Sequence, residues 1–452
     1  MSLFTGQALN WLCLILEERF GHSFELTQSH NALKLTLTES SRGYILFPKL
    51  EEAFHQSCSD SPCSQWCASS EGWHSALNLP LPAPCVSELA RPLIKHNQDH
   101  VVINYDILGL TYWMLNRIEE IGRTDLDEHE RFPAVASHAY RYGYLERPII
   151  DEWMIILGQV INKIWPNSKL KKHKFQIKVS HDVDEPARYA FQNLKGIIKK
   201  VSGDLIIRRD FKSLINGPVV WLNSGKDIHK NDPLNTFDWL MEQSEKNGLT
   251  SAFYFICGRT DKEKDARYDP EMSQIRSLMR KISRRGHEIG LHPSYNTYNQ
   301  PDKIKLEFQR LKKICAEENI VQDEWGGRMH FLRWNQAITP RAWSDAGMSY
   351  DSTLSYADNP GFRCGTCFEY PGFDIVTQKK LALRIRPLIA MEGSVISKTY
   401  LGLGSTEEAY EKFSDLKSKC KKVNGVFSLL WHNSFFRSPM HYKIYSRLIR
   451  KS

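Results

Sequence analysis

The chain has 452 residues and a formal net charge of +8; 41% of its residues are hydrophobic and 25% are charged. These values are typical of a soluble globular protein with room for two or three domains. No stretch reaches the roughly 18 apolar residues that a transmembrane helix needs. The first twenty residues have no basic leader, and Glu17 and Glu18 interrupt their apolar stretch, so we expect no secretion signal and a cytoplasmic location.

Basic residues and cysteines exclude two further classes. The densest basic clusters, at 169–174 and 276–285, are typical of a linker and a solvated helix face, and no nucleic-acid-binding module accompanies them. We therefore expect no nucleic-acid partner. The ten cysteines predict free thiols, because their spacing does not give the two well-formed pairs of a zinc site.

Residues 1–165 predict a smaller accessory α+β domain. Helices are expected over Ala8–Phe20, which Gly21 ends, over 106–121 and over 151–165. Leu33, Leu35 and Leu37 alternate with polar residues as in a half-buried strand, and the Ser-, Cys- and Pro-rich segment 56–85 predicts a long loop. Catalytic residue types do not cluster here.

Residues 174–452 alternate between strand-like and helix-like segments. The expected strands are 175–179, 251–257, 288–291, 329–332, 348–351, 383–389 and 426–431, and Pro387 gives the sixth an edge position or an early end. Apolar stripes predict helices around 234–241, 304–314 and 409–420, the last opened by a Ser405-x-x-Glu408 capping box. Repeated βα units indicate a parallel sheet, and about seven strands fit an α/β barrel.

The first of these strands ends in Ser180-His181-Asp182-Val183-Asp184-Glu185-Pro186. Side chains alternate along a strand, so Asp182 and Asp184 are expected on one face and His181 on the other. Two carboxylates on one face repel each other unless a cation or a proton lies between them. A solvated Asp-rich turn is the alternative interpretation.

Polar groups also follow four later strands. The segments are Gly286-His287-Glu288-Ile289-Gly290-Leu291-His292-Pro293-Ser294-Tyr295-Asn296, Arg328-Met329-His330-Phe331-Leu332-Arg333-Trp334, Asp351-Ser352-Thr353-Leu354 and Leu429-Leu430-Trp431-His432-Asn433. Active sites of such folds lie at the carboxyl ends of the strands, so these segments are expected to face the paired carboxylates.

The order of these motifs resembles the polysaccharide deacetylase superfamily, carbohydrate esterase family 4, over about residues 174–437. The family's Thr-Phe-Asp-Asp-Gly is matched by Ser180–Glu185, its Gly-His-Glu-Ile lead-in to His-Ser/Thr-x-x-His by 286–296, and its Leu-x-His by Leu430-Trp431-His432. Segments 350–354 and 361–366 resemble a branch found with surface-polysaccharide biosynthesis, and 144–148 resembles the accessory N-terminal domain of that branch.

The resemblance implies a distorted (β/α)7-type barrel and a hydrolase that depends on a divalent metal, with Zn²⁺ the first candidate. Its reaction would remove an N-acetyl group from an amino sugar of a surface glycan or of its lipid-linked or nucleotide-linked precursor, with metal-bound water as nucleophile. Asp182 is the implied general base, His432 the general acid, and Asp184 and His292 are metal ligands. This division of labour suits amide hydrolysis, which needs an activated water and a protonated leaving amine.

The chain departs from the family pattern at the metal site. The family's second ligating histidine falls at Asn296, so Asn296 ligates, a water takes the place, or the metal binds loosely or not at all. His287 is another possible ligand, although its place matches a structural histidine of the family.

The family uses an arginine to orient the catalytic aspartate. Arg333 and Arg328 both qualify, and strand parity lets only one face the pocket; we favour Arg333, near the strand's end. Arg328, His330 and Arg363 are then candidates for substrate binding. His330 could instead be a histidine of the core, and Arg363 could instead form a salt bridge. Hydrolysis of another C–N bond, such as a cyclic amide, and a non-catalytic glycan-binding role are alternative functions.

Overall fold

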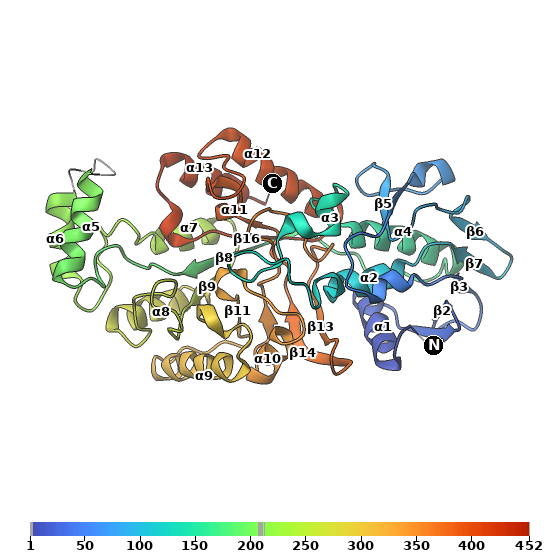
Figure 1. Ribbon diagram of the computed structural model, residues 1–452, viewed down its shortest axis with the longest axis horizontal. Coiled ribbons are helices and arrows are strands. Elements are labelled where there is room, and N and C mark those ends of the chain that lie inside the picture. Colours follow the sequence, from blue (N-terminus) through green and yellow to red (C-terminus); the bar gives the residue numbers. More distant parts are fainter. Residues whose placement is uncertain (1–2, 207–210, 212, 452) are drawn as a thin grey trace.

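The computed structural model describes residues 3–206, 211 and 213–451, and its N-terminal half contains two β-sheets (Figure 1). The order of the first sheet is β1-β2-β3-β7-β6, and β4 pairs with β5 in a second, two-stranded sheet. The elements of this half are α1 (Gly6–Phe20), β1 (Phe24–Ser29), β2 (Ala32–Leu37), β3 (Tyr44–Phe47), β4 (Cys63–Trp66), β5 (Leu81–Pro84), β6 (Ile94–His96), β7 (His100–Ile103), α2 (Ile107–Leu115), α3 (His138–Arg141) and α4 (Ile149–Ile164).

The helix predicted over 106–121 ends at Leu115, because Arg117 has left-handed backbone (φ 48°). The other predicted N-terminal helices and the strand around Leu33 agree with these bounds to within two residues. Gly21 ends α1 in the left-handed conformation (φ 77°), and Asp106 caps α2 by accepting a hydrogen bond from the Gly109 N–H. The segment 56–85 is not only a loop, because it contains both strands of the small sheet. All ten cysteines are free, as predicted.

The C-terminal half is built on a nine-stranded, mostly parallel sheet. Its order is β13-β14-β12-β11-β10-β9-β8-β16-β15, and only the β13–β14 pair is antiparallel. The elements are β8 (Gln176–Val183), α5 (Leu194–Ile206), α6 (Ser213–Asn223), α7 (Phe237–Lys246), β9 (Ser251–Phe255), α8 (Ser273–Arg284), β10 (Glu288–Leu291), α9 (Pro301–Glu317), β11 (Gly326–Gly327), α10 (Thr339–Ala346), β12 (Tyr350–Asp351), β13 (Tyr370–Asp374), β14 (Lys379–Ile385), β15 (Ala390–Met391), α11 (Glu392–Ile396), α12 (Glu407–Lys422), β16 (Val426–Leu430) and α13 (Pro439–Leu448).

This sheet confirms the predicted α/β class with a parallel sheet, but not a closed barrel. Among the described residues, no strand pairing joins the β13–β14 end of the sheet to β15. The sixth predicted strand ends at Ile385, before Pro387 removes a backbone donor. The α12 cap lies one residue later than the predicted box, because the Thr406 hydroxyl accepts from the Ala409 N–H. In the described part of the chain, no helix has the length and apolar character needed to cross a membrane.

The predicted strand 329–332 is wrong, and its place in the sheet is taken by β11. A Cβ on Gly326 would lie 2.0 Å from the Tyr350 ring, and one on Gly327 would lie 1.9 Å from the Leu291 carbonyl oxygen, so only glycine allows this close strand approach. Beyond β11 the chain leaves the sheet, because Phe331 and Leu332 have left-handed backbone (φ 60° and 56°). Side-chain alternation along a strand therefore does not determine which way Arg328 and Arg333 point.

Buried ion pairs join the two halves of the chain. The Arg363 guanidinium binds Glu120 with an Nη2–Oε2 distance of 2.6 Å, and Arg117 binds the same carboxylate at 2.8 Å. Arg363 is only 3% exposed and does not line the pocket described below. The predicted substrate-binding role of Arg363 is therefore corrected to a structural one.

An Arg363→Met variant is expected to lose about 3–5 kcal/mol of unfolding free energy, because it leaves the buried Glu120 with one cationic partner fewer. Denaturant unfolding of the full chain measures this loss. A Glu120→Leu/Arg363→Met double variant removes both charges and is expected to recover part of it. Unchanged stability together with a raised KM would instead support a substrate-binding role.

Candidate active site

β8 delivers two aspartates to the carboxyl end of the sheet. Asp182 and Asp184 lie on one side of the strand, and His181 lies on the other, where its Nδ1 is 2.6 Å from the Trp431 carbonyl oxygen. The expected alternation is therefore present. Burial lowers the pKa of His181 to about 3, despite that hydrogen bond, so His181 is a neutral core residue.

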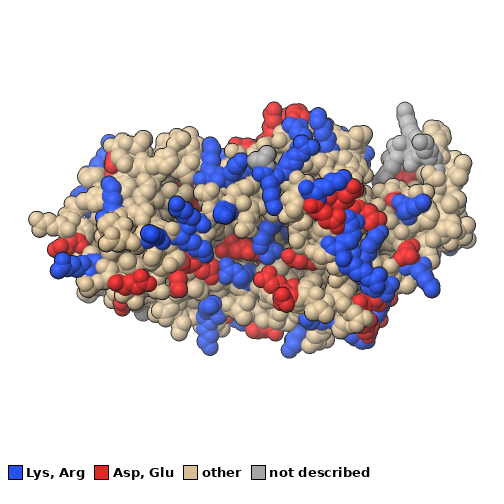
Figure 2. All heavy atoms as spheres, turned by 180° about the vertical axis from the view of Figure 1, so that it is seen from behind, with Lys and Arg blue, Asp and Glu red and all other residues tan. Residues whose placement is uncertain are grey.

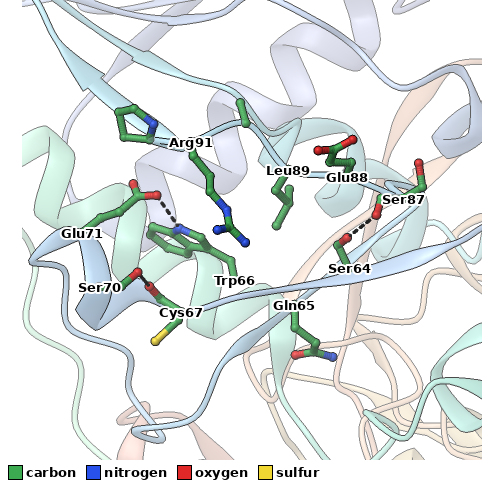
Figure 3. A pocket seen from close by; sticks show the side chains of 12 residues that line it. Ser64, Gln65, Trp66, Cys67, Ser70, Glu71, Ser87, Glu88, Leu89 and Arg91 are labelled. Atoms are coloured by element: carbon green, nitrogen blue, oxygen red, sulfur yellow. Dashed lines mark hydrogen bonds between the residues drawn. The ribbon is translucent and has the colours of Figure 1, made fainter.

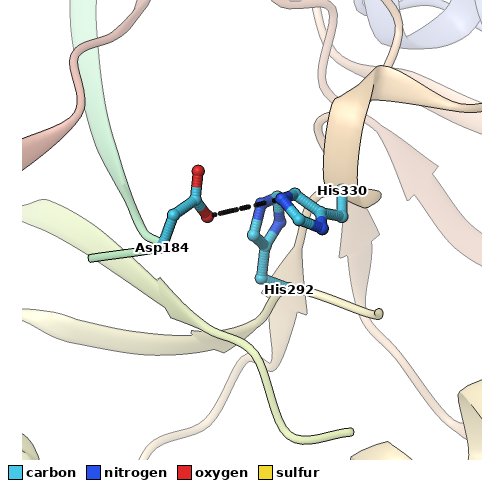
Figure 4. A group of neighbouring side chains, drawn as sticks. All are labelled: Asp184, His292 and His330. Carbon is cyan, nitrogen blue, oxygen red and sulfur yellow. Dashed lines mark ion pairs between the residues drawn. The ribbon is translucent and has the colours of Figure 1, made fainter. Parts of the chain in front are cut away.

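Three histidines converge on Asp184 from other strand ends. The Nε2 atoms of His292 and His330 lie 3.3 Å and 3.8 Å from Asp184 Oδ1, and His432 Nε2 lies 3.5 Å from Oδ2. His292 follows β10, His330 lies in the turn after β11, and His432 follows β16. Figure 4 shows both His292 and His330 beside the carboxylate of Asp184.

Hydrogen bonds fix the orientation of the first two imidazoles. His292 Nδ1 lies 2.6 Å from the Arg328 carbonyl oxygen, and His330 Nδ1 lies 3.0 Å from Asp265 Oδ1. Both partners are acceptors, so in the neutral imidazoles Nδ1 carries the hydrogen and Nε2 presents a lone pair toward Asp184. Histidine ligands of metals commonly have such an acceptor at the ring nitrogen that does not bind the metal.

Asp184, His292 and His330 therefore form a site that fits a cation. Their ligand atoms lie within 4.8 Å of one another, and Asp184 Oδ1 is buried without a hydrogen-bond partner. Two nitrogen lone pairs and a carboxylate oxygen at one point need a positive charge between them. When no cation is bound, protonated imidazoles supply the positive charge instead. Burial would raise the pKa of Asp184, but cationic His330, His292 and His432 outweigh it and hold the pKa well below its usual range.

Two charged pairs flank this cluster. Arg328, fully buried, donates to Asp182 Oδ1 at 2.7 Å and to the Ser180 hydroxyl at 2.8 Å, while Asp182 Oδ2 lies 3.7 Å from His292 Nε2. On the other side, His432 Nδ1 lies 2.5 Å from Glu392 Oε1. Burial would lower the pKa of His432, but Glu392, Asp184 and Asp182 outweigh it and raise the pKa to about 10.

Arg333 and Asn296 lie elsewhere, contrary to expectation. Arg333 binds Glu130, donates to the Tyr295 carbonyl oxygen at 2.9 Å and donates to Asn296 Oδ1 at 3.1 Å. The Asn296 amide N–H is donated to the Thr260 carbonyl oxygen. Arg328 therefore holds Asp182 in place of Arg333, and His330 completes the cluster in place of Asn296.

The other alternative ligand, His287, lies outside the cluster. Its Nδ1 accepts a hydrogen bond from the Ser251 N–H, and its Nε2 lies 3.4 Å from Glu245. His287 precedes β10, whereas His292 follows it, so the strand separates the two imidazoles. The packing role favoured for His287 agrees with this placement.

The cluster lies in a small pocket of about 170 Å³. Carboxylates and imidazoles form one side, and Leu332, Met391 and Leu430 form an apolar wall. Arg131, from the N-terminal half, reaches the rim and donates to the Phe331 carbonyl oxygen at 2.9 Å and to the Tyr400 hydroxyl at 3.3 Å. It thereby holds the left-handed turn that carries His330, and no sequence pattern marks it for this position.

A larger hollow, of about 1190 Å³, lies in the N-terminal half beside β4 (Figure 3). Its Glu71 carboxylate accepts hydrogen bonds from the Trp66 indole N–H and from the backbone N–H groups of Leu93 and Ile94. Glu71 therefore holds the loop that forms the wall. None of the described residues lining this hollow is a histidine, so the candidate active site is the smaller pocket.

An Asp265→Asn variant is expected to bind Zn²⁺ about 10- to 100-fold more weakly, because the acceptor that orients His330 is lost. Metal-competition titration with a chromophoric chelator measures the change. Asp261→Asn is the matched control, since Asp261 lies in the same loop and its Oδ1 accepts from the Glu263 and Lys264 N–H groups rather than from a histidine. Equal affinities for Asp265→Asn and the unmodified protein would exclude His330 as an oriented ligand.

Comparison with known proteins gives one family match and several distant structures. Residues 5–166 match a family described as "Family of unknown function (DUF7033)", and no curated protein matches the chain. Structures with similarity include a "putative polysaccharide deacetylase from Mycobacterium smegmatis" (16% identity, TM-score 0.40, 62% of this chain and 84% of that one). A "probable Polysaccharide deacetylase from Pseudomonas aeruginosa PAO1" (12%, 0.36, 61% and 84%) and "Puue Allantoinase" (11%, 0.35, 61% and 83%) are also similar. With TM-scores below 0.5, these similarities establish neither the reaction nor the substrate of this chain.

Proposed function

We propose that the protein is a metal-dependent amide hydrolase that removes an N-acetyl group from an amino sugar of a surface glycan or its precursor. The observation that carries the proposal is the convergence of Asp184, His292 and His330 at one point. The Asp182 carboxylate, bound by Arg328, and the His432 imidazole, bound by Glu392, lie beside these three side chains. A divalent cation held by these three side chains would polarise the amide carbonyl and lower the pKa of a water near it.

The remaining side chains suit the two proton transfers of amide hydrolysis. Asp182 accepts the water's proton on Oδ2, because Arg328 occupies Oδ1 and fixes the carboxylate. His432 donates a proton to the departing amine, since Glu392 orients Nδ1 and favours the imidazolium. Both groups border the cluster: Asp182 Oδ2 lies 3.7 Å from His292 Nε2, and His432 Nε2 lies 3.5 Å from Asp184 Oδ2.

The pocket favours a small acyl group. Its volume of about 170 Å³ is below the 300–1,000 Å³ of pockets that enclose a drug-sized ligand. The wall of Leu332, Met391 and Leu430 suits a methyl group, so the acetyl carbon enters and the sugar stays at the rim. We assign Zn²⁺ as the metal because one carboxylate and two imidazoles, with an open position, form a common catalytic zinc site.

The proposal extends to the organisation of the chain. We assign residues 1–165 to an accessory α+β unit and 174–452 to the catalytic unit, whose open sheet we interpret as a distorted (β/α) barrel. The accessory unit contributes Arg131 to the pocket rim. A cytoplasmic site of action and a nucleotide-linked or lipid-linked substrate belong to the same proposal.

Acetate release from N-acetylated amino-sugar substrates in the presence of Zn²⁺ tests this function. The panel contains free oligosaccharides, nucleotide-linked and lipid-linked sugars, and cyclic amides. Release from a sugar substrate that is lost in the His432→Ala variant is the expected result. Hydrolysis of the cyclic amides alone would assign the alternative reaction, and bound glycan without turnover would assign a binding protein.

A further inference from the structure

Helices α5 and α6 form a hairpin at one end of the molecule. They follow β8 and precede α7, and in Figure 1 they lie at the end opposite the N-terminal sheet. A small core of its own holds the hairpin together, formed by Tyr189, Ile197, Val201 and Val220 with Trp221 packed against it. This core faces inward, so the opposite faces of both helices are left to the surroundings.

Those outer faces are unusually apolar. Of the sixteen large hydrophobic side chains exposed in the described part of the chain, eight lie between residues 194 and 222. They are Leu194, Ile198, Ile206, Phe211, Leu214, Ile215, Val219 and Leu222. Ile206, Ile215 and Leu222 are 75%, 74% and 73% exposed, and the eleven residues of α6 include no charged side chain. Exposed apolar clusters of this kind mark interaction surfaces.

The exposed charge of the described helices is entirely positive. α5 carries Lys195, Lys199 and Lys200, and its one acid, Asp204, is buried and bound by Arg188. Seen from behind, the hairpin end of the molecule is mostly tan, with a few basic and acidic side chains near it (Figure 2). In the described residues of α5 and α6, exposed apolar side chains lie beside lysines and no acid is exposed, which is the composition of helices that lie in a bilayer interface.

We propose that the outer faces of α5 and α6 bind the surface of an anionic lipid bilayer. Leu, Ile and Phe side chains would enter the boundary between headgroups and acyl chains, and the lysines would contact anionic headgroups. A second copy of the chain fits less well, because the exposed charges among the described residues of α5 and α6 are all lysines, which would face one another. With 13 and 11 residues, α5 and α6 are too short to span the bilayer and would lie on it.

The hairpin contacts the segment that follows β8. Lys200 Nζ lies 3.4 Å from Glu185 Oε1, and Glu185 adjoins Asp184 in sequence. A bilayer bound at the hairpin would therefore be held close to the strand that carries the two aspartates. The inference goes beyond the proposed hydrolysis and does not depend on it, since it rests only on the surface of α5 and α6.

Vesicle flotation of the full chain tests this inference. The unmodified protein is expected to float with vesicles that contain phosphatidylglycerol, and less with pure phosphatidylcholine. Ile215→Asp/Leu222→Asp is expected to reduce the bound fraction on anionic vesicles at least about tenfold, and Lys195→Gln/Lys199→Gln is expected to reduce it about tenfold or more. Val321→Asp is the matched control, because Val321 is 89% exposed but lies after α9, and its binding should not change.

Three outcomes would overturn the inference. The first is that the unmodified protein floats with neither kind of vesicle. The second is that the Ile215→Asp/Leu222→Asp variant floats like the unmodified protein. The third is that light scattering finds the unmodified protein to be a dimer and this variant to be a monomer. Hydrolysis of a water-soluble substrate separates this failure from failure of the proposed function. Because the hairpin variants leave the pocket residues intact, they are expected to retain that hydrolysis.

Discussion

A His330→Ala variant is expected to bind Zn²⁺ at least about 100-fold more weakly than the unmodified protein, whereas Asn296→Ala is expected to keep its affinity. The loss should exceed the 10- to 100-fold effect of removing the acceptor that orients a ligand, because the ligand itself is removed. His330 Nε2 lies 3.8 Å from Asp184 Oδ1, while the Asn296 amide is bound to Arg333 and Thr260. The comparison separates the ligand set of the structure from the ligand set of the sequence motif.

Metal content after dialysis and competition titration measure both affinities. His287→Ala is a second control, since His287 is also a buried histidine next to β10 but lies away from the cluster. Circular dichroism and the thermal midpoint of unfolding establish that each variant is folded. Loss of zinc in Asn296→Ala with retention in His330→Ala would restore the family pattern and contradict the structure.

An Asp182→Asn variant is expected to lower kcat about 10²- to 10⁴-fold while it retains zinc. Asparagine keeps the shape of the side chain and one acceptor for Arg328, which donates to Asp182 Oδ1 at 2.7 Å. It cannot take up the proton of the attacking water, so the chemical step slows and substrate binding changes less. The split between kcat and KM is therefore part of the prediction.

Asp351→Asn provides the matched control. Asp351 is another buried carboxylate at a strand end of the same sheet, but it accepts hydrogen bonds from Thr353 and does not line the pocket. Its kcat is expected to remain within a few fold of the unmodified protein. If Asp182→Asn loses zinc together with activity, Asp182 is a ligand and another group serves as base.

The parts of the site that could be predicted lie at the ends of regular strands. Asp182, Asp184, His292 and His432 follow strands whose apolar pattern is clear, and the structure brings all four to one pocket. Strand periodicity fixes which face a side chain takes, so the separation of His181 from Asp182 was also predictable. The segments that form the short strands β13 and β15 show no such apolar pattern.

The site could not be predicted where the backbone is irregular. The directions of the Arg328, His330 and Arg333 side chains are predicted from the alternation along a strand expected at 329–332. The strand of the structure, β11, ends before it, at Gly327. The left-handed residues after it turn His330 into the cluster and Arg333 out of it, and they are held by Arg131, about 200 residues earlier in the chain. Contacts over such a distance in sequence leave no local pattern. The Gly326-Gly327 pair was the one available signal that the strand is short.

Anomalous diffraction from crystals grown with Zn²⁺ tests the central claim most directly. We predict a single ion with Asp184 Oδ, His292 Nε2 and His330 Nε2 at about 2.0–2.2 Å, and Arg328 still bound to Asp182. Zinc held by Asn296, or crystals in which these three side chains hold no ion, would contradict it.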